Sequence, residues 1–327
     1  MTATETANRL LKALRSWKYV LKERYLRLFA PHESPYPPSW PLPPADELKN
    51  LVVRWPASRI GGELHQWLFP ILTGLRRHVR VEIVPIEQPK MSANFLELVR
   101  GGKSYTLAID THDFMDRLDQ GALDQAVVYF KMQFHKDGYG NDRIVPGGYV
   151  NLSEHYCHYL GWLRGTKDRQ LAEYDVYGRF SLDFAPEVRK RAVQMLWDQK
   201  QFHFEGSLQT VRYTRSLEEA ARSRLCIDLP GNGDFCFRLI DYLGIGACVV
   251  AARHRTILPM PLEDRKHLVY AKEDLSDFVE LCQYYLEHED ERNQIVQNSR
   301  EYWDRYLHPT QLGAYYLHTA LKIIDAS

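Results

Sequence analysis

The stretch of the chain best suited to binding an anionic ligand covers residues 226–250, in the second half. It starts as an apolar strand, passes through a turn with two glycines and continues into a helix. Gly231 and Gly233 carry no Cβ, so the backbone of the turn can approach a ligand closely. The free N–H groups at the start of the helix favour an anion there. The sequence predicts ligand contacts from Pro230, Gly231, Asn232, Gly233, Asp234 and Phe235.

Two charged residues follow on this helix. Arg238 lies in its first turn and could make a charge-assisted contact with a diphosphate. Asp241 lies three residues later on about the same face, where a carboxylate could accept hydrogen bonds from ribose hydroxyls. The alternative is a plain turn followed by a solvated ion pair between these two side chains.

A second polar group, Asp110-Thr111-His112-Asp113, follows an apolar strand in the first half of the chain. Polar residues at the carboxyl end of such a strand project toward a ligand. A carboxylate or an imidazole there could accept a proton from an acceptor hydroxyl, with Asp110 the first choice, followed by Asp113 and His112. The alternative is an Asx-type turn or a helix cap.

A further loop, with Arg59, Gly61, Gly62 and His65, is also suited to an anion and starts a predicted helix. His155 and His158 lie one helical turn apart but have no third ligand at a recognisable spacing. The five cysteines form no C-x-x-C pair, so we expect reduced thiols and no metal site.

The elements that must position these residues alternate along the chain. Expected strands are residues 51–55, 79–86, 105–110, 125–134, 175–182, 202–205, 225–229, 247–251 and 268–271. Expected helices are residues 63–77, 186–197, 216–223 and 235–243, followed by a largely helical segment at 275–324 that is broken near 308–309. Residues 137–150 are expected to form a loop. Such alternation predicts an α/β protein with two Rossmann-like domains facing each other across a cleft.

Before these elements, residues 9–29 combine a basic face with an aromatic and aliphatic face at helical spacing. An amphipathic helix of this kind binds anionic lipid, or packs on its own protein or a second subunit. Residues 31–44 contain seven prolines and are expected to form an extended strap.

Composition excludes several classes of protein. Lysine plus arginine equals aspartate plus glutamate at 42 each, so no nucleic-acid partner is expected. No apolar run is long enough to span a membrane and no signal peptide is visible. The expected location is the cytoplasm, with peripheral attachment to the inner membrane face as an alternative.

Several residues in the second half follow a recognisable order: Ser223 to Cys226, Pro230-Gly231, Arg238 to Leu243, Gly246 and Val249-Val250, with Tyr213 and Leu217 upstream and Ile257-Leu258-Pro259 downstream. This order resembles the nucleotide-sugar domain of GT-B glycosyltransferases, particularly the exostosin group and the capsule-associated protein O-glucosyltransferase-like group. The resemblance covers about residues 213–307. It implies that Asp241 binds ribose, that Arg238 and the glycine turn face the diphosphate, and that Tyr213 lies near the donor.

The resemblance also implies an enzyme, a hexosyl- or related transferase that is inverting and independent of metal. Its donor would be a UDP- or GDP-sugar, with no other cofactor, and its acceptor a carbohydrate, a lipid-linked sugar or a protein. Arg179 is a candidate second cation for the diphosphate, or a surface arginine. Two departures from the family pattern are Asp234, where a small hydroxyl residue is common, and the missing second glutamate upstream in the helix.

The expected units are residues 1–45 (helix and strap), 46–165 (acceptor domain), 166–307 (nucleotide-sugar domain) and 308–327 (a helix returning to the acceptor domain). Two alternatives to transfer stay open: a non-catalytic module that binds a sugar nucleotide or a partner, and a sugar-nucleotide epimerase.

Overall fold

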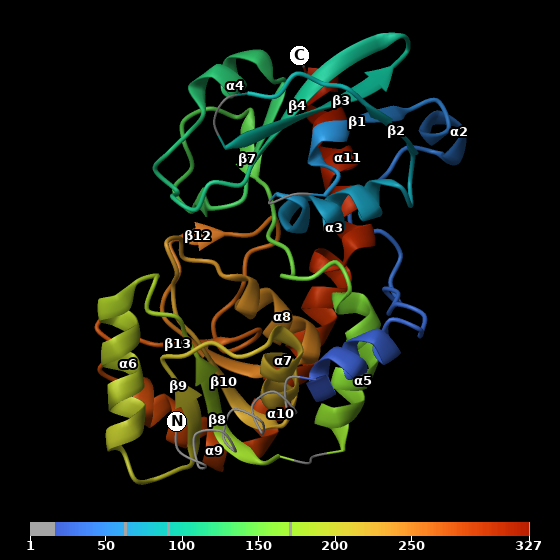
Figure 1. Ribbon diagram of the computed structural model, residues 1–327. Coiled ribbons are helices and arrows are strands. Elements are labelled where there is room, and N and C mark those ends of the chain that lie inside the picture. The colour runs from blue at the N-terminus through green and yellow to red at the C-terminus, as the bar shows by residue number, and fades with distance from the viewer. Residues whose placement is uncertain (1–16, 62–63, 90–91, 170–171, 327) are drawn as a thin grey trace, which may run out of the picture.

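The computed structural model describes residues 17–61, 64–89, 92–169 and 172–326. These residues form a mixed α/β structure with two main sheets, one in each half of the chain (Figure 1). The helices are α2 (Ala45–Leu48), η1 (Ala57–Arg59), α3 (His65–Leu75), α4 (Gln120–Gln125), α5 (Tyr156–Asp168), α6 (Pro186–Asp198), α7 (Tyr213–Ala221), α8 (Phe237–Ile245), α9 (Phe278–Glu287), α10 (Glu289–Tyr302), the π-helical η2 (Trp303–Leu307) and α11 (Pro309–Ala326).

The first sheet has six strands in the order β2-β1-β3-β4-β5-β7. Its strands are β1 (Val52–Pro56), β2 (Arg80–Val84), β3 (Ala93–Arg100), β4 (Lys103–Asp110), β5 (Val128–Lys131) and β7 (Ile144–Pro146). The pairs β1–β2, β4–β5 and β5–β7 are parallel, whereas β3 is antiparallel to both of its neighbours.

A Rossmann-like first half implies parallel strands, and β3 departs from that expectation. Arg100 pairs with Lys103 across a two-residue turn, and both residues of that turn, Gly101 and Gly102, have positive φ, at 57° and 79°. Two successive residues with positive φ make the tight turn that suits a twisted hairpin. The segment 137–150, expected to be a loop, also contributes the short strand β7.

The second sheet has five strands in the order β13-β11-β10-β8-β9. They are β8 (Tyr174–Arg179), β9 (Phe204–Ser207), β10 (Ser223–Asp228), β11 (Cys248–Ala251) and β13 (Val269–Tyr270), and all neighbours pair in parallel. An all-parallel sheet with this winding is Rossmann-like, as expected from the alternation of elements.

Helices cover both faces of the second sheet. Side chains of β8, β10 and β11 alternate between two buried clusters, as the two-residue period of a strand requires. One cluster joins the sheet to α6 and α9, and the other joins it to α7 and α8. This second cluster continues into α3, α5, α11 and the first sheet, so one apolar core runs through both halves.

The halves are also joined by chain crossings. The last helix, α11, leaves the second half and packs against α3 beside the first sheet (Figure 1). The contact is close because two glycines face each other: a Cβ on Gly74 would lie 1.8 Å from the carbonyl oxygen of Pro309, and a Cβ on Gly313 would lie 2.2 Å from the carbonyl carbon of Gly74. A two-stranded antiparallel sheet, β6 (Phe134–His135) with β12 (Thr256–Ile257), links the halves a second time.

At the start of the described chain, residues 17–26 are helical and lie beside α5, and the expected helical residues 9–16 lie outside the described part. Residues 31–44 form no helix or strand and run against η2 and α11, with Ser34 and Ser39 hydrogen-bonded to Asp304 and Gln311. Among the described residues, no helix is long and apolar enough to cross a membrane. All five cysteines are free thiols.

Candidate active site

The second sheet changes winding direction between β8 and β10, because the chain moves outward to β9 after β8 and to β11 after β10. Ligands of open α/β sheets bind beyond the carboxyl ends of the strands at such a point. The glycine turn predicted from the sequence follows β10 directly and leads to α8. The fold therefore places this turn where a ligand is expected.

A buried charged cluster lies at the carboxyl ends of these strands. Asp228, the last residue of β10, is fully buried, and within the described residues neither of its carboxylate oxygens accepts a hydrogen bond. Arg238 Nε lies 3.4 Å from one of these oxygens and His254 Nε2 lies 3.5 Å from the other. Arg238 also donates to the carbonyl of Leu229 at 3.0 Å and stacks 4.6 Å from the ring of Phe180. Although burial opposes its charge, the nearby Asp228 carboxylate raises the pKa of Arg238.

A second arginine joins the cluster from α6. Arg189 is 3% exposed and donates to the carbonyl oxygens of Pro230 at 2.9 Å and Ser181 at 2.6 Å. Burial, followed by the neighbouring charge of Arg238, lowers the pKa of Arg189. Two guanidinium groups thus stand beside a single carboxylate, and this excess positive charge favours an anionic ligand.

Three residues of this cluster were not predicted from the sequence: Asp228, His254 and Arg189. Asp228 ends β10, and His254 follows β11 by three residues. The rule that picked out Asp110, a polar residue at the carboxyl end of a strand, applies equally to both of them. Arg189 has no such signal, because a helix of unknown orientation does not reveal which of its arginines faces the sheet.

The glycine turn contacts the first half of the chain. A Cβ on Gly233 would lie 2.3 Å from the carbonyl oxygen of Asp113 and 2.4 Å from Gln133 Nε2, so glycine is needed here for close approach. Gln133 Nε2 donates to the backbone carbonyl of Phe235 at 3.0 Å, and Gln133 Oε1 accepts from the backbone N–H of Phe235 at 3.2 Å. Asn232 Nδ2 donates to Asp113 Oδ2 at 3.2 Å. The structure therefore brings the two sequence-predicted groups, residues 110–113 and 230–235, into direct contact.

Asp234 points away from the turn. Its Oδ2 accepts from the backbone N–H of Arg255 and, at 3.2 Å, from that of Thr256. This carboxylate therefore fixes the start of β12, and its contact with a donor stays a prediction.

The three candidate bases of the first half have different surroundings. Asp110 is fully buried, and its two oxygens accept from Ser92 Oγ, the His112 backbone N–H, Tyr129 Oη at 2.6 Å and Lys131 Nζ at 2.9 Å. All the accepting positions of this carboxylate are thus occupied by the chain itself. This arrangement gives Asp110 a structural contact set and leaves no position for an acceptor hydroxyl.

His112 and Asp113 are partly exposed. The backbone N–H of Phe114 donates to His112 Nδ1 at 3.1 Å, so the neutral ring carries its proton on Nε2 and can donate there. Asp113 uses one carboxylate oxygen for Asn232, and no hydrogen bond to the other is found among the described residues. Of the three candidates, Asp113 is the one whose carboxylate contacts the glycine turn, and its role as a base stays a prediction.

Asp241 faces the segment between the two halves and lies apart from Asp228. It is 3% exposed, and Asn151 Nδ2 donates to its Oδ1 at 2.7 Å. Tyr156 Oη donates to its backbone carbonyl at 2.6 Å, and Tyr213, the first residue of α7, lies beside it. Although the hydrogen bond from Asn151 opposes the effect, burial raises the pKa of Asp241 to about 7. Ribose binding by Asp241 and the role of Tyr213 stay predictions.

The raised pKa of Asp241 predicts a pH-dependent stability. The folded protein keeps this proton up to about pH 7, whereas the unfolded chain loses it near the ordinary value of 3.8. The contribution to stability is fully present below 3.8 and is lost as the pH rises through 7. Asp241→Asn removes this titration. The free energy of unfolding of the variant should therefore increase relative to that of the wild type as the pH rises. Urea unfolding between about pH 5 and about pH 8 measures the difference. Asp46→Asn, at an exposed carboxylate, is the control, and a difference that stays constant with pH would contradict the prediction.

Arg179, at the end of β8, is committed to carboxylates. Its guanidinium is 11% exposed, pairs with Glu219 at 2.6 Å and with Glu205, and donates to Ser207 Oγ at 3.0 Å. The structure therefore gives this arginine two acidic partners, the buried Glu219 and the partly exposed Glu205. Contact with a diphosphate stays a prediction for Arg179.

The loop after β1 lies near the segment that links the halves. Gly61 has a φ of 75°, and its N–H donates to His65 Nδ1 at 3.1 Å. His65 Nε2 lies 3.0 Å from Glu154, whose other oxygen lies 3.2 Å from His155 Nε2. Arg59 Nε is buried without a hydrogen-bond partner among the described residues, and Gly62 lies outside them. Within the described part of the chain, no group of three or more His, Cys, Asp or Glu side chains could hold a metal ion.

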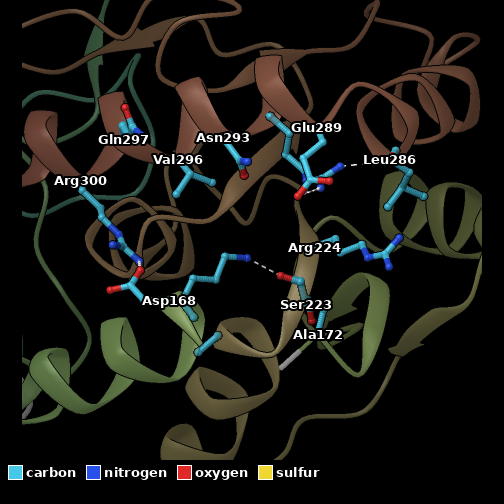
Figure 2. Close-up of a pocket in the computed structure, with 13 residues that line it drawn as sticks. Asp168, Ala172, Ser223, Arg224, Leu286, Glu289, Asn293, Val296, Gln297 and Arg300 are labelled. Carbon is cyan, nitrogen blue, oxygen red and sulfur yellow. Dashed lines mark hydrogen bonds and ion pairs between the residues drawn. The ribbon is translucent and has the colours of Figure 1, made fainter. Parts of the chain in front are cut away.

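A cavity of about 570 Å³ opens at the opposite edge of the second sheet, where β10 begins (Figure 2). It is lined by α5, α10 and the start of β10, and none of the predicted site residues contributes to it. Arg300 points across it to Asp168 at 2.7 Å, and the buried Arg292 donates to backbone carbonyls at 2.7 and 3.0 Å. Both of these arginines are therefore held by partners within the chain.

The second half of the chain matches a known protein family. Residues 162–311 match the family model described as glycosyl transferase-like. The crystal structure of a glycosyltransferase from Rickettsia africae ESF-5 is similar over 54% of this chain, with 12% sequence identity and a TM-score of 0.31. The match covers 47% of the Rickettsia chain, so the present chain spans about half the length of that glycosyltransferase. No curated protein matches the sequence. The family match, which contains the glycine turn and both β10 and α8, supports a glycosyltransferase.

Proposed function

We propose that this protein transfers a sugar from a nucleotide-sugar donor to an acceptor hydroxyl. The observation that carries the proposal is the excess positive charge beside the glycine turn at the winding change of the second sheet. It lies within the segment that matches the glycosyl transferase-like family. Within glycosyltransferases, the exostosin and capsule-associated groups fit the run 223–250 best, and the donor domain of a GT-B enzyme is the matching arrangement.

In this proposal the diphosphate of the donor lies against residues 230–233 and the first turn of α8. The backbone N–H groups of the helix start and the Arg238 guanidinium face the leaving group. Arg189 stabilises the turn through its hydrogen bond to the carbonyl of Pro230. Charge develops on the diphosphate as the glycosidic bond breaks, and fixed cations stabilise it. Because the arginines supply this charge, the proposed reaction needs no metal ion.

The acceptor lies on the side of the first half. Asp113 takes the proton of the acceptor hydroxyl while the oxygen attacks the anomeric carbon from the face opposite the leaving diphosphate. One bond to the sugar forms as the other breaks, so the configuration inverts. Asp110 holds the loop through its backbone contact with His112, and His112 Nε2 can donate to the donor or the acceptor. The proposed donor is a UDP- or GDP-sugar, and the proposed acceptor is a carbohydrate, a lipid-linked sugar or a protein in cytoplasmic glycan biosynthesis.

One observation favours a second function, a module that binds a sugar nucleotide without transferring the sugar. The Asn232–Asp113 hydrogen bond and the β6–β12 pair tie the turn to the first half. An acceptor must enter at this junction for transfer to occur. If the hydrogen bond and the strand pair both persist when the donor is bound, the protein binds the sugar nucleotide but does not transfer the sugar.

A thermal-shift series with UDP, GDP and dTDP tests donor binding, because a ligand that binds the folded state raises the melting temperature. The wild type should respond to at least one of them, and Arg238→Gln should lose the response. Arg224→Gln, at the other end of β10 and half exposed, should keep it. Because Arg238→Gln leaves Asp228 without this partner, Gly231→Val provides a second variant that keeps every charge. Its Cβ would lie 3.2 Å from Cys236 Sγ and crowd the turn, so this variant should also lose the response.

The outcomes separate the candidate functions. A wild type that ignores all three nucleotides at millimolar concentration would overturn donor binding. Binding without sugar transfer or donor hydrolysis, tested with UDP-, GDP- and dTDP-sugars, would favour the non-catalytic module. Interconversion of free sugar nucleotides would indicate an epimerase.

A further inference from the structure

The helix formed by residues 17–26 has one face that packs against its own protein. Lys22 Nζ lies 3.8 Å from the centre of the Trp162 ring and 2.9 Å from Glu218. Glu23 accepts from Arg212 and Thr214 of the second half at 2.9 and 2.7 Å, and Leu26 is 6% exposed. The helix is therefore fixed to α5 and α7 by both ion pairs and apolar contact.

The opposite face is apolar and has no partner among the described residues. Trp17, Leu21 and Tyr25 are 60%, 61% and 60% exposed, and a spacing of four places them on one side of the helix. Leu28 and Phe29 extend this surface, at 82% and 50%. We call these five side chains the aromatic stripe. The other exposed large hydrophobic residues of the described chain are scattered, and each is less than half exposed: Ile60, Ile83, Phe114, Phe184 and Trp197.

Positive charge borders the stripe. Lys18 follows Trp17 on one edge, Arg24 precedes Tyr25 on the other, and both are exposed. In the sequence, residues 9–29 contain seven lysines and arginines and a single acidic residue. That acidic residue, Glu23, is turned inward to Arg212. Among the described residues of this segment, the charge that faces outward is therefore entirely positive.

A cavity of about 400 Å³ lies next to the stripe, between residues 25–30 and α5. Its lining is largely apolar and includes Tyr25, Leu26, Phe29, Ala30 and Trp162. An acyl chain is an occupant of matching polarity for such a space.

We propose that the aromatic stripe docks on an anionic lipid surface, with the apolar side chains at the boundary between headgroups and acyl chains and with Lys18 and Arg24 at the phosphates. Burying apolar area and attracting anionic lipid are the two terms that hold an interfacial helix. A second copy of the chain is a poorer occupant, because a symmetric contact would bring the same positive borders together. The inference uses no part of the donor site and does not rest on the proposed function.

Sedimentation with lipid vesicles tests the proposal on the full chain. The wild type should bind vesicles in which about a third of the lipid is phosphatidylglycerol, bind phosphatidylcholine vesicles much less, and dissociate as salt is raised. Leu21→Glu should reduce binding at least about tenfold, because it places a charge in the stripe. Trp197→Glu, at an exposed aromatic residue on α6, is the matched control and should bind like the wild type.

Three results would overturn the proposal. The first is that the wild type does not bind anionic vesicles. The second is that Leu21→Glu and Trp197→Glu lose vesicle binding to the same extent. The third is that light scattering shows a wild-type dimer, which Leu21→Glu converts to a monomer. Melting temperatures of both variants show whether either loss comes from unfolding, and Leu21→Ser supplies an uncharged second variant at the same position. Nucleotide binding should be the same in all of these proteins, so failure here is separate from failure of the donor site.

Discussion

Replacing Asp113 by Asn should lower the rate of sugar transfer by about 10²–10⁴-fold, the usual contribution of a general base. The amide keeps the size of the side chain, and its oxygen can still accept from Asn232 Nδ2, so the junction between the two halves should persist. Donor affinity should therefore change little while kcat falls. Steady-state kinetics with a saturating donor, together with nucleotide binding by calorimetry, separate these two quantities.

Asp116→Asn is the matched control for this variant, because Asp116 is an exposed carboxylate in the same loop. It should retain the wild-type rate. An Asp113→Asn protein with full activity would show that the base lies elsewhere. A parallel loss of donor affinity in that variant would show that Asp113 positions the donor and is not a base.

The second large effect is on stability and concerns the buried pair of Lys131 and Asp110. Both side chains are fully buried, with Nζ and Oδ2 2.9 Å apart. Burial lowers the pKa of Lys131, and the Asp110 carboxylate opposes that effect. Lys131→Met removes the cation and leaves the carboxylate buried without its counter-charge, which costs about 3–5 kcal/mol of unfolding free energy. Urea unfolding followed by tryptophan fluorescence measures the loss.

Lys49→Met is the comparison for the buried pair, because the Lys49–Asp46 ion pair is 3.2 Å long but 75% and 96% exposed at its two side chains. It should change stability by less than about 1 kcal/mol. The double variant Lys131→Met with Asp110→Asn should recover part of the loss, since no charge is then buried. A Lys131→Met protein as stable as the wild type would mean that the pair contributes nothing to the fold.

The sequence predicted the repeating elements of the fold well because strand and helix periodicity is local. Nearly every expected strand and helix is present within a few residues, including α6 (Pro186–Asp198) and β11 (Cys248–Ala251). The hairpin strand β3 was missed, although the Gly101-Gly102 turn after it was visible in the sequence. The β6–β12 pair could not be predicted, because its two strands are two residues long and about 120 positions apart.

The candidate site could be predicted from the sequence only in part. The polar group after β4 was recognised, but spacing alone does not tell Asp110 from Asp113. Only the fold shows that Tyr129 and Lys131 of the neighbouring strand occupy the first carboxylate, while the second faces Asn232. In the same way, Arg238 and Asp241 are three residues apart on one helix, yet one contacts Asp228 and the other contacts Asn151.

The return of α11 to the first half has a consequence for biosynthesis. The face of α3 around Gly74 is covered by residues near position 313, which leave the ribosome more than two hundred residues later. Until then, the first sheet has its strands but lacks one of the helices that cover them. This half of the protein must therefore wait, partly uncovered, until α11 has been synthesised, and a chaperone that shields apolar surface would act on it during that interval.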